Sequence, residues 1–94
     1  MIIGACTLHL YLSGVFSLKE KRHVLKPLTN QLRRRFEVAV AEVSENDTWQ
    51  RAVVAVVTVS NDTRHVYAVL DKVVHWIEEE YRAVELIDWE IELR

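Results

Sequence analysis

The chain has 94 residues, half of them apolar, and only two Gly and one Pro, which excludes a disordered protein and predicts a single domain over residues 1–94. Its one cysteine, Cys6, excludes an intrachain disulfide and favours a reducing, cytoplasmic setting. The net charge of −2 conceals an asymmetry, because residues 1–36 carry seven Lys and Arg against one acid, whereas residues 37–94 carry five against thirteen. We therefore expect one basic face rather than a basic protein.

The first half of the chain predicts a strand, a helix and a second strand. Residues 2–12 alternate with period two, which is typical of a strand. Ser17 and Glu20 form a capping box, so we expect a helix from there to about Arg35, bent rather than broken at Pro27. Residues 36–43 alternate again and predict the second strand. The apolar residues that share one side of the helix are Leu18, Val24, Leu25, Leu28 and Leu32.

The second half of the chain again predicts a strand, a helix and a strand. Residues 52–59 are almost wholly apolar and β-branched, which favours a strand in the centre of a sheet, paired as a hairpin with 36–43. Residues 60–63 are rich in helix-capping types and predict a second helix to about Tyr81. Residues 87–93 alternate apolar and acidic side chains, which predicts a last strand with one buried face. The apolar residues of the second helix that we expect to face the core are Val66, Val69, Leu70, Val73, Val74 and Ile77.

The order of the elements predicts an α+β fold. A βαββαβ chain of this size is typical of a ferredoxin-like sandwich, an antiparallel four-stranded sheet with two helices on one face. Right-handed crossovers give the strand order 4-1-3-2, with the first and third strands in the middle. No apolar run reaches the roughly 20 residues of a membrane span, and the apolar start lacks a basic leader, so we expect neither a membrane segment nor a signal peptide.

The first helix carries the clearest candidate site. Relative to Leu18, four of its cations lie on one flank between about 40° and 100° around the helix, and no acid interrupts them: Arg22, Arg33, Lys26 and Lys19. Such a flank either contacts the phosphates of a nucleic acid or is simply a solvated face balanced by the acidic second half. The predicted anion-binding residues are Lys19, Lys21, Arg22, Lys26 and Arg33.

A second candidate surface comes from the open face of the sheet and the hairpin. The first strand would show His9 and Tyr11 there, but the third strand has no aromatic residue, which argues against base stacking on the sheet and favours a covering partner or a second copy. Trp49, Gln50 and Arg51 are the predicted partner contacts at the hairpin. For Trp49 the alternative, which we favour, is that it packs the hairpin onto the core.

Enzymatic chemistry finds little support. Asp71 and His75 have the i, i+4 spacing of a metal pair, but no second pair of ligands accompanies them, so we expect no metal and no cofactor. Cys6 is predicted to be a core residue. The turn at residues 13–17 offers helix amides to an anion, as the phosphate turn of acylphosphatases does, but it has only Gly14. A phosphate-binding hydrolase is therefore a minor alternative.

Several segments together resemble the YlxP-like family of small bacterial proteins of unknown function. They are Ser17-Leu-Lys-Glu-Lys-Arg22, Val40-Ala-Glu-Val43, Trp49-Gln-Arg-Ala52 and Val59-Ser60, and the resemblance covers essentially the whole chain. It implies a ferredoxin-like fold, no established activity, and gene neighbours that act in transcription and translation, including ribosome-binding factor A. We therefore expect a non-enzymatic protein that binds RNA or a ribosomal particle through the first helix, or alternatively a homodimeric adaptor that uses the open sheet face.

Overall fold

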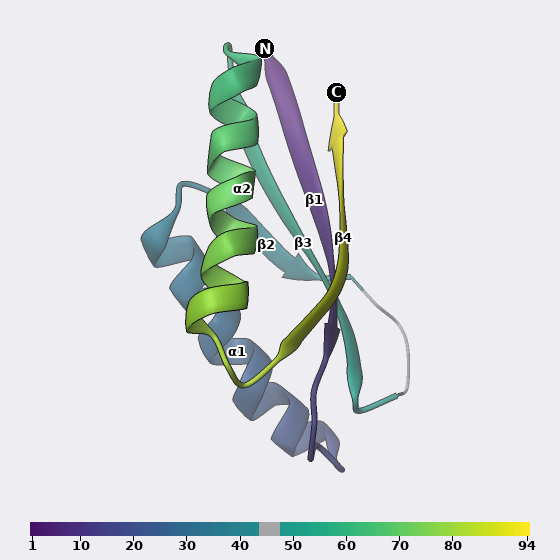
Figure 1. Cartoon of the computed structure of the whole chain (residues 1–94). Coiled ribbons are helices and arrows are strands. Elements are labelled where there is room, and N and C mark those ends of the chain that lie inside the picture. Colours follow the sequence, from purple (N-terminus) through teal and green to yellow (C-terminus); the bar gives the residue numbers. More distant parts are fainter. Residues whose placement is uncertain (44–47) are drawn as a thin grey trace.

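The computed structural model describes residues 1–43 and 48–94. In chain order the elements are β1 (Ile2–Tyr11), α1 (Leu18–Arg35), β2 (Ala39–Glu42), β3 (Arg51–Ser60), α2 (Thr63–Glu80) and β4 (Glu85–Leu93). The strands form one antiparallel sheet in the order β2-β3-β1-β4, and both helices lie on one side of it (Figure 1). This confirms the predicted ferredoxin-like sandwich and its strand order.

The core lies between the helices and one face of the sheet. On β1 and β3 every second side chain is buried against the helices, and the alternate ones are only partly covered. α2 approaches the sheet so closely that a Cβ at Gly4 would lie 2.2 Å from Cγ1 of Val66, which explains why β1 has a glycine at this position. The uncovered face of the sheet is therefore the open face that the alternation predicted.

The strand β2 is shorter than the alternation over 36–43 predicted. Phe36 caps α1 by donating its amide to the Leu32 carbonyl at 3.0 Å, and its ring packs edge-on against Trp76. The Val38 amide then bonds the Phe36 carbonyl in a tight turn. The first residues of the predicted strand therefore serve the end of the helix, and pairing with β3 begins at Ala39.

The helix α1 begins where the capping box predicted. The Glu20 amide donates to Ser17 Oγ at 3.1 Å, and the Glu20 carboxylate reaches back to the Phe16 amide at 3.4 Å. The helix continues through Pro27, which is exposed. The prediction that Leu18 faces the core is wrong, because its side chain is 53% exposed and the buried stripe consists of Lys21, Leu25, Leu28 and Leu32.

The edge strand β4 is less buried than its alternation predicted. A β-bulge at Ile87 shifts the register between the His9 and Leu10 pairs. Trp89 and Leu93 face the helix side but stay 41% and 38% exposed, because β4 is the edge strand and α2 packs chiefly over β1 and β3. The predicted buried face of this strand is therefore only partly buried.

Candidate functional site

Three exposed cations follow one another along α1, and we call Lys19, Arg22 and Lys26 the cationic flank. With Leu18 and His23 they line one open groove. Within residues 1–43 and 48–94 no carboxylate lies within salt-bridge distance of any of the three. Their charge is therefore directed to solvent, as the sequence predicted, and is available to an anionic ligand.

Lys21 does not belong to the cationic flank, although the sequence analysis grouped it there. Its side chain is only 4% exposed, and Nζ donates to the Thr48 carbonyl at 3.2 Å. The reason is helical geometry, because Lys21 precedes Leu25 by four residues and Leu28 by seven, which places it in the buried stripe. It links α1 to the hairpin and has little surface to offer a phosphate.

The C-terminal turn of α1 carries three arginines in different environments. Arg33 donates to the Val40 carbonyl at 2.7 Å and to the Asn30 side chain at 3.3 Å, so its guanidinium is partly engaged within the fold. The guanidinium carbon of Arg35 lies 5.1 Å from the centre of the Trp76 ring, in a cation–π contact. Arg34 is exposed. Arg34 therefore adds an exposed cation at this end of α1, whereas the guanidinium of Arg33 is partly bonded within the fold.

The hairpin residues lie against the N-terminal end of α1. The Gln50 side-chain amide donates to the Val15 carbonyl, and the Gln50 carbonyl accepts from the Leu12 amide at 2.7 Å. Trp49 is 45% exposed, so the favoured expectation that it packs into the core is wrong. The Gln50 side chain is thus bonded to the segment that leads into α1. Trp49, in contrast, presents a large exposed surface at the hairpin.

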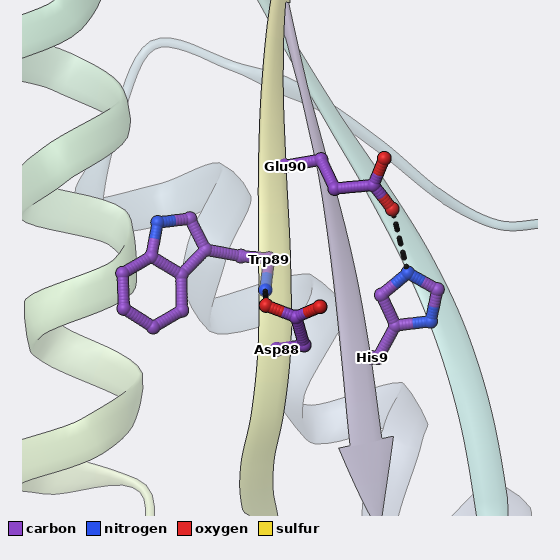
Figure 2. Close-up of polar contacts among 4 residues, drawn as sticks. All are labelled: His9, Asp88, Trp89 and Glu90. Atoms are coloured by element: carbon purple, nitrogen blue, oxygen red, sulfur yellow. Dashed lines mark hydrogen bonds and ion pairs between the residues drawn. The ribbon is translucent and has the colours of Figure 1, made fainter.

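The other predicted partner contacts lie on the open sheet face. His9 Nε2 lies 3.1 Å from the Glu90 carboxylate, whereas Trp89 points to the opposite side of β4 (Figure 2). Tyr11 is 36% exposed and pairs across the sheet with Arg51, which is exposed as well. The register places four acids on this face of β4, namely Glu85, Asp88, Glu90 and Glu92. The open face is thus apolar in the middle and acidic along one edge.

Three other features were considered in the sequence: a metal pair, the Cys6 thiol and an anion-binding turn. Residues 1–43 and 48–94 contain no group of three or more His, Cys, Asp or Glu that could hold a metal ion. Burial, and to a lesser degree the charge of Asp71, raises the pKa of the Cys6 thiol to about 11, so it remains a protonated core residue at neutral pH. At the predicted anion turn, the Phe16 and Glu20 amides are bonded to side chains of the same segment. No helix in the described part is long and apolar enough to cross a membrane.

One exposed residue near this site, Phe16, was not predicted from the sequence. Phe16 is 68% exposed and directly precedes the cap of α1. It lies outside both the strand and the helix, so no periodicity reports which way its side chain points. The burial of Lys21, in contrast, was visible in the sequence, because a helical projection places it with Leu25 and Leu32.

Three comparisons place the chain among known proteins. The family model described as a protein of unknown function, DUF503, matches residues 3–91. The uncharacterised protein YlxP of Bacillus subtilis (strain 168) is 34% identical over 73 residues, which cover 78% of this chain and 77% of YlxP. A de novo designed protein with a ferredoxin fold aligns with a TM-score of 0.56 at 10% identity, over 100% of this chain and 84% of the design. The first two findings confirm the predicted YlxP-like resemblance, and the third supports the fold alone.

Proposed function

Because the chain belongs to the DUF503 family, whose function is unknown, we propose a function from its own surface: it is a non-enzymatic RNA-binding protein that uses the cationic flank of α1. The observation that carries this proposal is the exposure of Lys19, Arg22 and Lys26 without an ion-paired acid in the described part of the chain. Surface cations are normally interspersed with acids, whereas α1 has only Glu20, whose carboxylate is engaged in the cap. The unbalanced charge therefore favours an anionic ligand.

A polyanion fits this arrangement better than a small anion does. The cations follow one another at intervals of three and four residues, so the flank is a row about 10 Å long from Lys19 to Lys26. A row of point charges matches successive phosphates of a nucleic-acid strand, each contact releasing a counterion. A single phosphate would use only one or two of them. The acids on β4, at the sheet edge remote from β2, would orient the molecule by repelling the same strand.

The test is RNA binding with two charge-matched variants. A structured ribosomal RNA fragment is the first ligand, and binding is followed by fluorescence anisotropy at about 50 and 200 mM salt. We expect the triple variant Lys19/Arg22/Lys26→Glu to lose binding. The control Arg64/Lys72/Arg82→Glu changes the net charge equally but at exposed sites outside α1, and it should retain binding. Loss of binding in both variants, or in neither, would contradict a specific role for the cationic flank.

A second candidate function is a homodimeric adaptor that uses the open sheet face. The observation in its favour is that the apolar residues of this face are uncovered, with Val59 59% and Tyr11 36% exposed. The proposal predicts a dimer in sedimentation at high concentration that Val53→Glu, on the open face of β3, abolishes. The control Ala68→Glu, on the exposed side of α2, should leave the dimer intact. A monomer at every concentration would refute this candidate, and it would not affect the first, because the two use different surfaces.

A further inference from the structure

Large apolar side chains are exposed where the cationic flank begins. Phe16 is 68% exposed and Trp49 is 45% exposed. Leu18, at the first position of α1, is 53% exposed and lines the same groove as Lys19 and Arg22. Packing within the domain does not account for two exposed aromatic rings near the start of a helix whose exposed cations Lys19, Arg22 and Lys26 form no ion pair with any described residue, so their exposure favours a ligand.

Both aromatic residues are held in place by the surrounding backbone. The Phe16 amide donates to the Glu20 carboxylate, within the cap of α1. Trp49 lies between two residues that are bonded to the same region: the Thr48 carbonyl accepts from Lys21 Nζ at 3.2 Å, and the Gln50 side chain donates to the Val15 carbonyl. Segments 27 and 35 residues apart in the chain thus meet at the N-terminal end of α1. The backbone that carries the two rings is therefore positioned before a ligand binds, which lowers the entropic cost of binding.

We propose, resting on the RNA-binding function proposed above, that Phe16 and Trp49 stack unpaired bases while Lys19, Arg22 and Lys26 hold the adjoining phosphates. The ligand class is therefore single-stranded RNA or an RNA loop. Aromatic platforms beside a row of cations are the usual means of binding single strands, because every base has a face that can stack. In an A-form duplex the base faces are already stacked on one another, so exposed rings on the protein gain nothing from it.

The charge distribution favours this ligand over an anionic membrane. A helix that lies in a membrane surface needs an apolar face along its length. In α1 the only large apolar side chain that is exposed is Leu18, at the first position, and the rest of the exposed flank is cationic. The aromatics are therefore gathered at one end of a charged row, which suits a strand whose bases and phosphates bind different parts of one surface.

A matched control exists on the far side of the molecule. Trp89 is 41% exposed, close to the exposure of Trp49, but it lies on β4, at the sheet edge opposite β2, and its neighbours in sequence are the acids Asp88 and Glu90. If exposed aromatic surface alone were sufficient for binding, Trp49→Ala and Trp89→Ala would have equal effects. If stacking requires the neighbouring cations, only Trp49→Ala matters.

The experiment compares three probes by fluorescence anisotropy or sedimentation: an unstructured RNA of about 12 nucleotides, the corresponding RNA duplex, and vesicles of phosphatidylglycerol. We expect Trp49→Ala to weaken single-strand binding by roughly 5- to 100-fold, and Phe16→Ala to weaken it in the same direction. Trp49→Phe should retain most of the affinity, which separates stacking from a folding defect. Trp89→Ala should bind as wild type does, and duplex affinity should change by less than about twofold in every aromatic variant.

The outcomes separate base stacking by the aromatic residues from RNA binding by the cationic flank. Suppose that wild type binds RNA through the cationic flank, but that Trp49→Ala weakens binding of duplex and single strand equally or weakens neither. The stacking proposal is then overturned, and the RNA-binding function remains. If wild type binds neither RNA at low salt, both proposals are overturned. If it binds only the vesicles, the surface is a membrane contact, which likewise overturns both.

Discussion

Lys21 and Arg22 are adjacent in the sequence, and the structure predicts opposite roles for them. Arg22 is exposed on the cationic flank, whereas Lys21 is 4% exposed and donates to the Thr48 carbonyl. Replacement of each by Met removes one positive charge and keeps an unbranched side chain, so the two variants have the same net charge. If α1 contacts phosphates, only Arg22→Met removes a contact.

The number of phosphate contacts sets how steeply RNA affinity falls with salt. Lys21 and Arg33 are hydrogen-bonded within the fold. Four other cations of α1 are exposed and form no such bond with the described residues: Lys19, Arg22, Lys26 and Arg34. With about four phosphate contacts to a single strand, the logarithm of affinity falls by about 2.8 per logarithmic unit of salt. Affinity should therefore drop by about 50-fold between 50 and 200 mM salt.

The assay is anisotropy of a labelled single-stranded RNA at four or more salt concentrations, with circular dichroism to confirm that each variant is folded. We expect Arg22→Met to reduce the slope to about 2.1, with an affinity about fivefold lower at 100 mM salt. Lys21→Met should leave the slope at about 2.8, whatever it does to stability. Equal reductions of the slope in the two variants would refute the assignment of Lys21 to the interior and of Arg22 to the binding surface.

Three further predictions concern the fold that holds this surface. Gly4→Ala should lower the free energy of unfolding by about 1–3 kcal/mol in urea denaturation, because the added methyl overlaps a side chain of α2; a change under about 0.5 kcal/mol would contradict the close packing. Tyr81→Phe should cost about 1 kcal/mol, since it removes the hydroxyl that donates to the Val24 carbonyl at 2.8 Å, and an unchanged urea midpoint would show that this bond contributes nothing. Burial raises the pKa of Cys6 from 9.0 to about 11, so the unfolded chain loses this proton first; stability should fall by up to about 3 kcal/mol as pH rises through that interval, and less so in Cys6→Ala. An equal fall in that variant would assign the effect to other groups.

The fold could be predicted from the sequence because its local signals agree with one another. Alternation along β1, the capping box at Ser17 and the apolar run of β3 each predict one element, and their order leaves one common topology. The start of β2 could not be predicted in this way. Phe36 continues the alternation of that strand in sequence, but in the structure it caps α1 and packs on Trp76, a contact between distant segments.

The candidate site was predictable only in part, for the same physical reason. Helix periodicity placed Lys19, Arg22 and Lys26 on one flank. The same periodicity predicts that Lys21 is buried if the inward side is defined by Leu25 and Leu28 instead of Leu18. The exposure of Phe16 and Trp49 had no such signal. Both lie between regular elements, where the direction of a side chain depends on how the hairpin meets α1, and only the folded structure reveals that meeting.

An NMR map of the RNA contact would show directly whether RNA binds where α1 meets the hairpin. The ¹⁵N-labelled protein is titrated with the unstructured RNA, and amide shifts are followed over all described strands and helices. We expect the shifted amides to lie at residues 16–26 and 48–51, where α1 meets the hairpin, and β4 to be unaffected. Shifts confined to the open sheet face around His9 and Glu90, or no shifts at low salt, would contradict it.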